Sequence, residues 1–242
     1  METSVETTES GKAGLWEDFI DIFFQPAAVF ERRRDGKFGL ALLVLAVLSG
    51  VLFFALHNGI APIMDAEMAR QAQMIAAKNP QITTEQLAAQ QGMMEKFANV
   101  GFVLFVPIGI AITAALMWVV AKFLDAKIAF AAAMMIATYS TVPRLIETVI
   151  NAVQGLFLSP ESITSRYSVQ VGPARFLDIA SANPIVMTLL GGLDLFSIWT
   201  IVLLAIGVAV VAKVPISRGA IVGFMVWLFG LLPSLYQAMT QA

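Results

Sequence analysis

Five long apolar segments alternate with polar connections along this chain of 242 residues. A helix that crosses a lipid bilayer needs about 20 consecutive apolar residues, and each of the five segments approaches or exceeds that length. They cover approximately residues 38–57, 98–121, 128–150, 195–212 and 216–239. The pattern therefore predicts an all-α membrane protein in which residues 38–242 form a bundle of five transmembrane helices.

Two shorter elements are predicted ahead of the first span. Residues 1–14 are polar and acidic and are expected to be disordered, whereas residues 15–37 have helical patterning. One helix face carries apolar side chains and another carries acidic ones, namely Trp16, Phe19, Ile20 and Phe23 against Glu17, Asp18 and Asp21. Such an amphipathic helix either lies flat among lipid headgroups or packs on the cytoplasmic face of the bundle, and the pattern allows both arrangements.

A proline and a basic cluster mark a second helix in the same segment. Pro26 suits the first turn of a helix, where its missing N–H has no intrahelical partner to lose. The helix ends at Arg32, Arg33 and Arg34, which are expected to meet anionic lipid headgroups. Residues 15–37 are therefore predicted to be cytoplasmic helices at the membrane interface.

The two long connections between spans, residues 58–97 and 151–194, differ in pattern. The first has apolar residues at helical spacing, which predicts a helical loop. Within it, Thr83 and Gln86 have the spacing of a capping box, so a further helix is expected to begin there and to continue into the second span. The second connection is less regular and predicts only short helical pieces.

Composition agrees with a membrane protein and narrows its function. Hydrophobic residues make up 58% of the chain and charged residues only 13%, against roughly 25% charged in soluble domains. The net charge of −2 argues against a nucleic-acid partner. The sequence contains no cysteine, which excludes disulfides and thiolate metal sites.

Lysine and arginine are concentrated on one side of the predicted bundle. They cluster before the first span and in the short links that follow the second and fourth spans, at Lys122, Lys127, Lys213 and Arg218. Basic residues favour the cytoplasmic side, so the N-terminus is expected in the cytoplasm and the C-terminus outside. The two long connections are then outer loops, and the expected location is the cell membrane, as in a bacterial inner membrane.

Three charged residues within or next to apolar segments form the main candidate site. Arg144 and Glu147 share one face of a helix, and Asp194 is placed to cap the fourth span. Arg144 lies 17 residues beyond Lys127, about 25 Å along a helix, in a hydrocarbon core about 30 Å thick. We therefore expect an ionic cluster of Arg144, Glu147 and Asp194 near the outer boundary. The alternative is that each side chain reaches outer water separately.

Catalytic chemistry is not indicated. The HExxH, GxSxG and GxxxxGK[ST] patterns are absent, and the chain has a single histidine, at the end of the first predicted span. We expect no enzymatic activity, no cofactor and no metal site. Gly219, Gly223 and Gly230 lie on one face of the last span, where small residues let helices approach closely. Packing inside the bundle is favoured over a dimer contact, and a homo-oligomer stays possible.

Three stretches in order, FIDIFFQPAAVFERRR, ATYSTVPRLIE and LDLFSIWTIVLLAIGVAV, resemble the Yip family of five-span membrane proteins, the Rab- or Ypt-interacting group, in its bacterial form. The family-like positions are Pro26, Phe30, Tyr139 and Pro143. The resemblance implies a five-helix bundle with a cytoplasmic N-terminus and brings no catalytic residues. Eukaryotic members act in vesicle trafficking through partner proteins and Rab GTPases, but this chain's short N-terminal segment gives no reason to carry over a Rab-specific role.

These observations predict a non-enzymatic scaffold or adaptor in membrane organisation or trafficking-like processes. Its expected partners are the lipid bilayer and other membrane proteins. The alternative is a channel or transporter of a small solute. The interior of the bundle distinguishes them, because a scaffold is expected to have a packed apolar centre. A transporter is expected to have a water-accessible cavity lined by Tyr139, Arg144, Glu147 or Asp194.

Overall fold

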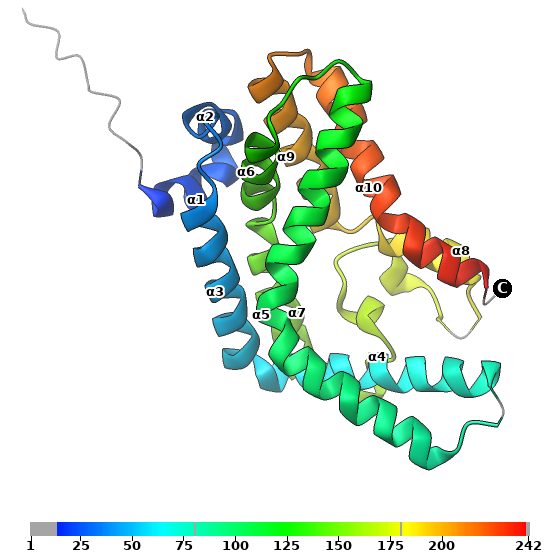
Figure 1. The fold of residues 1–242 in the computed structure, drawn as a ribbon. Coiled ribbons are helices and arrows are strands. Elements are labelled where there is room, and N and C mark those ends of the chain that lie inside the picture. Colours follow the sequence, from blue (N-terminus) through cyan, green and yellow to red (C-terminus); the bar gives the residue numbers. More distant parts are fainter. Residues whose placement is uncertain (1–13, 80, 180, 241–242) are drawn as a thin grey trace, which may run out of the picture.

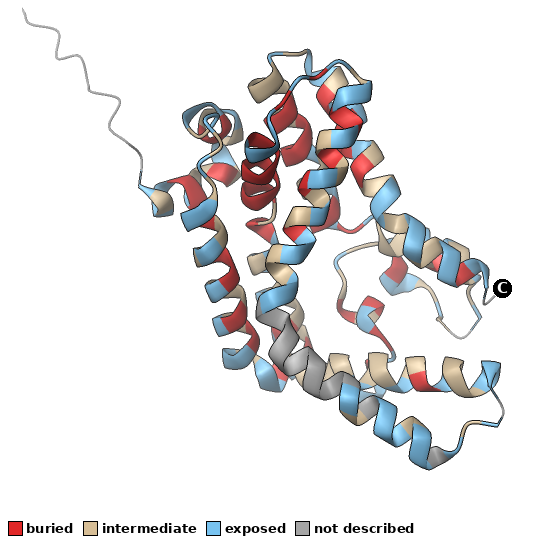
Figure 2. Cartoon of the chain, viewed as in Figure 1, coloured by how far each residue is buried: buried red, intermediate tan, exposed pale blue. Residues whose placement is uncertain are grey.

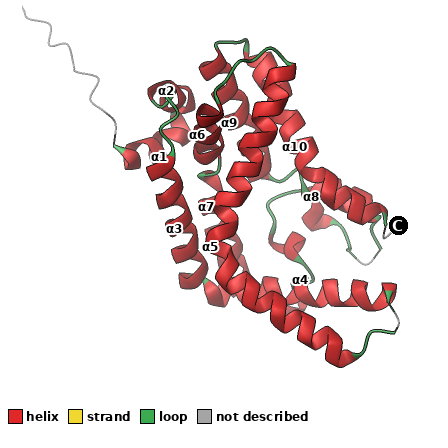
Figure 3. Cartoon of the chain, in the orientation of Figure 1, coloured by secondary structure: helices red, strands yellow, loops and turns green. Residues whose placement is uncertain are grey.

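A computed structural model describes residues 14–79, 81–179 and 181–240, without the side chains at positions 84, 91 and 94–103. This part of the chain is almost entirely helical and contains no strand (Figure 3). The α-helices are α1 (Leu15–Phe24), α2 (Pro26–Arg32), α3 (Gly39–Ala55), α4 (His57–Lys78), α5 (Thr84–Phe123), α6 (Phe130–Ser140), α7 (Pro143–Phe157), α8 (Pro184–Gly191), α9 (Leu195–Ala212) and α10 (Ile216–Met239). Apart from Gly14, the acidic segment 1–14 lies outside the described residues.

The helices assemble around α6, which neighbours α1, α3, α5 and α9. In Figure 1, α1, α2, the α5–α6 connection and the α9–α10 connection lie in the upper part of the molecule. Helix α4 runs across the bottom and bends away from α3 by 86°. Helix α8 and the C-terminal part of α10 project to the right.

Helix boundaries follow local chemistry. Thr83 and Gln86 form the expected capping box at the start of α5, with Thr83 Oγ1 accepting from the Gln86 N–H at 3.2 Å. Helix α5 then continues without a break through the second predicted span. Helix α9 ends where Lys213 adopts a left-handed backbone conformation (φ 54°), and Pro215 precedes the start of α10.

The third predicted span is not one continuous helix. Helix α6 ends at Ser140 and α7 begins at Pro143. Proline lacks the N–H that would continue the α-helical hydrogen-bond ladder. The chain instead turns through Thr141 and Val142, whose N–H groups donate to the carbonyls of the residues three positions earlier. The result is a short, tight break between two helices.

This break changes the expected number of spans. Among the described residues, three helical segments are long and apolar enough to cross a membrane, at Leu104–Phe123, Leu195–Ala212 and Ile216–Met239. A fourth is obtained if α3 and α4 count as one bent span. Helix α3 alone has 17 residues and α6 has 11. Length and apolarity therefore support three or four spans, while the bounds of α9 and α10 match the predicted ranges.

The apolar core is centred on α6, and the surrounding helices direct apolar side chains toward it. Every residue from Ala132 to Ser140 is buried (Figure 2). The surface of α3 that faces away from this core is apolar as well. Its exposed residues are Leu40, Leu43, Val47, Val51 and Phe54. A continuous apolar stripe of this kind is unusual on a protein surrounded by water. The molecule is thus a multi-pass membrane protein with apolar side chains both in its core and on its outer faces.

The burial of α1 does not follow the predicted division into an apolar face and an acidic face. Asp18 is completely buried together with Phe19, whereas Trp16 and Ile20 are exposed. The reason is that α1 packs against the bundle with the face that carries Asp18. Its buried apolar residues, Phe19 and Ile22, belong to the same hydrophobic core as those of α6.

The glycines of α10 have different surroundings. A Cβ at Gly219 would overlap the backbone carbonyl of Ala205 on α9, and one at Gly223 would lie 2.7 Å from the Ile201 carbonyl oxygen. Both glycines therefore allow close contact between α9 and α10 within the bundle. Gly230, which the sequence grouped with them, would place a Cβ in open space and takes no part in this contact.

We expect alanine substitutions at these glycines to have opposite effects on thermal stability in detergent. Gly219→Ala should destabilise the protein by about 1–3 kcal/mol, because the new methyl group forces α9 and α10 apart. Gly230→Ala meets no neighbour and should stabilise α10 by about 0.5–1 kcal/mol through helix propensity. Equal shifts of the unfolding midpoint would contradict the packing role of Gly219.

Candidate functional site

A buried carboxylate joins α1, α2 and α6. Asp18 is 0% exposed. Its Oδ1 accepts from Arg32 Nη2 at 2.9 Å, and its Oδ2 accepts from Arg33 Nε at 2.6 Å. Tyr139 Oη on α6 lies 3.4 Å from Asp18 Oδ2 and donates to it. Asp21 completes this group, which we call the Asp18 cluster, by pairing with Arg32 at 2.6 Å.

The Asp18 cluster is electrically balanced. It contains two carboxylates and two guanidinium groups, so no net charge remains in it. Burying an unpaired carboxylate would cost several kcal/mol, and the two arginines offset that cost with short charge-assisted hydrogen bonds. Arg32 and Arg33 keep 32% and 26% of their side chains exposed, so their charges stay partly hydrated.

The three arginines of the basic cluster have partners within the protein. Arg32 and Arg33 contact Asp18, while Arg34 forms an exposed pair with Glu31 at 2.7 Å. All three side chains stay partly exposed, and their contact with lipid headgroups stays a prediction. Asp18 itself was missed as a site residue. The available signal was a carboxylate in an apolar helix, followed 14 and 15 residues later by two adjacent arginines.

The four family-like positions lie around the same region. Pro26 begins α2, and Phe30, on the same helix, is fully buried. Tyr139 stacks edge-on against Phe19, with 6.0 Å between ring centroids, in addition to its contact with Asp18. Pro143 begins α7 four residues after Tyr139. The structure thus places Phe30 and Tyr139 on the contact between the N-terminal helices and the bundle, and Pro143 at the break that follows.

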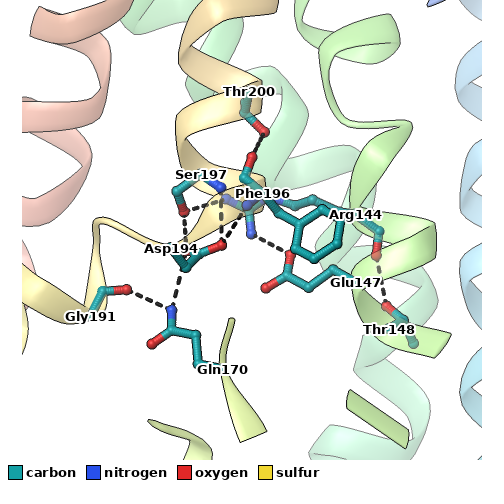
Figure 4. Close-up of polar contacts among 9 residues, drawn as sticks. All are labelled: Arg144, Glu147, Thr148, Gln170, Gly191, Asp194, Phe196, Ser197 and Thr200. Atoms are coloured by element: carbon teal, nitrogen blue, oxygen red, sulfur yellow. Dashed lines mark hydrogen bonds and ion pairs between the residues drawn. The ribbon is translucent and has the colours of Figure 1, made fainter. Parts of the chain in front are cut away.

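The second polar group lies at the start of α9 (Figure 4). Asp194 is 2% exposed and is the N-cap of α9. Its Oδ1 accepts from the N–H groups of Phe196 and Ser197 at 2.9 and 3.0 Å. Ser197 Oγ donates a hydrogen bond to Asp194 Oδ2. The N-terminus of a helix favours a negative charge, so this placement stabilises both the carboxylate and α9.

Arg144 reaches this group through Ser197. Its Nη1 pairs with Glu147 at 2.9 Å, and its Nη2 lies 3.3 Å from Ser197 Oγ. Arg144 and Asp194 form no direct ion pair, because Ser197 stands between them (Figure 4). The three predicted residues therefore belong to one chain of contacts, which we call the Asp194 network.

Gln170 brings the long second connection into the Asp194 network. Its Nε2 donates to Asp194 Oδ2 at 3.1 Å and to the Gly191 carbonyl at 2.6 Å. The Leu195 N–H also donates to the Val171 carbonyl at 2.9 Å. These contacts fix the loop against the start of α9. Sequence reasoning missed Gln170 and Ser197, since uncharged polar residues in a loop and in a helix carry little signal.

Chemically, both groups are suited to holding helices together. Each carboxylate oxygen of Asp18 and Asp194 already accepts at least one hydrogen bond from the protein. A reacting group needs an accessible atom, and these oxygens are buried and occupied. A cavity of about 850 Å³ lies elsewhere, between α4, the second long connection with α8, and the end of α10. Tyr139, Arg144, Glu147 and Asp194 do not line it.

Comparison with known proteins gives one match. The family model described as the Yip1 domain matches residues 20–236, which include the second half of α1 and all but the last residues of α10. Neither the curated proteins nor the solved structures contain a match to the chain. The matched region contains the Asp194 network and all of the Asp18 cluster except Asp18 itself.

Two isosteric substitutions test the importance of the buried carboxylate. Asp18→Asn should lower the free energy of unfolding by about 3 kcal/mol, because it removes the buried carboxylate that pairs with both Arg32 and Arg33. Asp21→Asn removes the same charge from a more exposed pair and should cost about 0.2–1 kcal/mol. Thermal unfolding of the purified protein in mild detergent measures both. Similar losses in the two variants would contradict the distinction drawn between the two aspartates.

Proposed function

The chain belongs to the family of the Yip1 domain, and from this premise we propose that it is a non-enzymatic scaffold or adaptor. In this proposal it acts through partner membrane proteins or through organisation of the bilayer, in processes related to membrane trafficking. The chain would work by presenting a rigid surface within the membrane. Partner proteins would bind its outer faces, and a second copy of the chain would be one such partner.

The observation that carries this proposal is the packed centre. Met135, Ile136, Leu203 and Val208 are at most 1% exposed and belong to one hydrophobic core. That core joins α1 and α2 to α6, α9 and α10. A tightly packed apolar centre suits a structural platform, since a route for a hydrated solute needs polar groups along a water-accessible path.

We further propose five membrane crossings, made by α3, α5, α6 with α7, α9 and α10. In this arrangement the N-terminus faces the cytoplasm and the C-terminus lies outside. Support comes from the basic residues, since the end of α2, the α5–α6 connection and the α9–α10 connection all lie in the upper part of Figure 1. The cell membrane, as a bacterial inner membrane, is the proposed location.

The N-terminal helices would contact lipid with the face that they turn outward. Trp16, Ile20 and Phe24 form an exposed stripe along α1 at four-residue spacing. Tryptophan and phenylalanine suit the boundary between acyl chains and headgroups. Arg34 is the most exposed of the three arginines that follow, at 50%, and would be the one best placed to meet a headgroup. In this proposal the helices serve both the bundle and the interface.

A channel or transporter of a small solute is the second candidate. The Asp194 network favours it to the extent that charged residues within membrane segments often mark ion or solute pathways. Glu147 is the member to test, because its side chain is only 18% exposed and its sole ion-pair partner among the described residues is Arg144.

Single cysteines test the proposed orientation, because the natural sequence has none. Lys127 and Glu161 are both exposed, in connections predicted on opposite sides. In right-side-out membrane vesicles, a membrane-impermeant maleimide should label Glu161→Cys and leave Lys127→Cys unlabelled. Detergent should make both accessible. Labelling of Lys127→Cys in intact vesicles would reverse or reject the topology.

Purification and transport assays test the scaffold proposal together. Gentle solubilisation should recover the tagged chain with a membrane-protein partner in a fixed ratio, identified by mass spectrometry. Vesicles reconstituted with the purified chain should show no more solute flux than empty vesicles. The transporter alternative predicts flux that Glu147→Gln abolishes and that the matched change Glu161→Gln, in an exposed loop, leaves intact. That result would reject the scaffold as the primary function.

A further inference from the structure

The cavity of about 850 Å³ has the size of a ligand-binding pocket. Pockets that bury a small ligand typically measure about 300–1,000 Å³. Helix α4 forms one wall, residues 163–188 a second, and the C-terminal part of α10 a third. These elements are far apart in the sequence and come together at the lower right of Figure 1. The cavity is therefore created by tertiary folding.

One of the cations in the wall is neutralised by the protein. Arg70 forms an ion pair with Glu67 at 2.5 Å and also contacts Met74 Sδ at 3.4 Å. Burial works to raise the pKa of Glu67, but the hydrogen bond and charge of Arg70, the charge of Arg166 and a hydrogen bond from Gln71 outweigh it, and the pKa is lowered. Glu67 is consequently ionised at neutral pH, and the Arg70–Glu67 pair adds no net charge.

The other two cations in the wall have no such partner. Arg166 lies over the ring of Tyr167, 5.0 Å from its centroid, and its Nη2 is 3.2 Å from Tyr167 Oη. Lys78 Nζ donates to Thr240 Oγ1 at 3.1 Å. Within the described parts of the chain, neither side chain forms an ion pair with a carboxylate. The Glu67 carboxylate, which also attracts Arg166, balances one of the three cations Arg70, Arg166 and Lys78, so two positive charges remain in excess at the cavity wall.

The rest of the lining is mostly apolar. Met187 is almost fully buried, and Met74, Ile163 and Ile179 add further apolar surface. Methionine side chains are flexible and adapt to ligands of irregular shape. Several alanines on α4, including Ala69, leave room for a chain to lie along the helix. Cationic groups and an adaptable apolar wall therefore share one cavity.

We propose that this cavity binds a single-chain lipid with an anionic headgroup, a phosphate or a carboxylate. Arg166 and Lys78 bind the headgroup, and the methionine and isoleucine side chains of the wall hold the acyl chain. A small soluble anion would leave the apolar wall empty, and a neutral lipid would leave both cations without a counter-charge. The site is separate from the Asp194 network and does not depend on the scaffold function.

Equilibrium binding to the full-length protein in phosphatidylcholine nanodiscs tests the proposal, with empty nanodiscs as background. The probe is radiolabelled lysophosphatidate, and the competitors are oleate, glycerol 3-phosphate and monooleoylglycerol. Saturable binding of the probe is expected, with strong competition by oleate or by unlabelled lysophosphatidate. If oleate competes, the site accepts a carboxylate as well as a phosphate headgroup. If oleate does not compete, the site is specific for a phosphate headgroup. Equal competition by glycerol 3-phosphate or by monooleoylglycerol would overturn the proposal.

Substitutions locate the binding within the cavity. Arg166→Gln should weaken binding about tenfold or more, because it removes a charge-assisted contact. Lys78→Gln, at an exposed side chain, should weaken it about two- to fivefold and serves if Arg166→Gln fails to fold. Ala69→Phe fills the space beside α4 and should block the probe.

Arg175→Gln is the matched control for these variants. Arg175 is in the same connection as Arg166 but contacts Gln154 and does not line this cavity. This change should leave the affinity for lysophosphatidate unaltered. Equal weakening by Arg175→Gln and Lys78→Gln would indicate general surface charge and would overturn the proposed site.

Discussion

The buried carboxylate of Asp18 is the constraint on which the position of the N-terminal helices depends. It lies where α1, α2 and α6 meet, and it has no access to water. A charge in that position must be neutralised at short range. Arg32 and Arg33 satisfy the requirement only when α2 folds back beside α1. The ion pairs therefore set the angle between the two helices, and Tyr139 connects them to α6.

The broken segment formed by α6 and α7 connects the two polar groups of the molecule. Tyr139, near the end of α6, contacts the Asp18 cluster, and Arg144, at the start of α7, contacts the Asp194 network. Only five positions separate the two side chains. The break at Thr141 and Val142 lets them extend to different neighbours. In a straight helix, both side chains would project at fixed angles from one axis. The break at the proline therefore helps α6 and α7 to contact two different polar groups.

The same features support the two proposed roles of the protein, as a scaffold and as a binding site for an anionic lipid. Its centre is packed and its carboxylates are occupied, as suits a platform in the membrane. Its cavity lies at the side, between α4 and the end of α10, where the wall carries three cations against the Glu67 carboxylate. The proposed lipid site is thus spatially separate from the packed core.

Sequence patterns were sufficient for features that depend on neighbouring residues. The bounds of α9 and α10, the capping box at Thr83 and the cap at Asp194 all follow from local spacing. The division of the third predicted span into two short helices at Pro143 was not predicted. Backbone hydrogen bonding and apolar length are properties of a short stretch of chain, so sequence alone reveals them.

The position of Asp18 could not be read in this way. A helical projection groups it with Glu17 and Asp21 as part of a solvated face, yet it is buried while Trp16 and Ile20 are exposed. Its partners lie 14, 15 and 121 residues away. Likewise, Gly219 and Gly230 look equivalent in the sequence, and only α9 distinguishes them. Burial of a charge and close helix contact depend on which distant groups the fold brings together, and tertiary structure alone decides that.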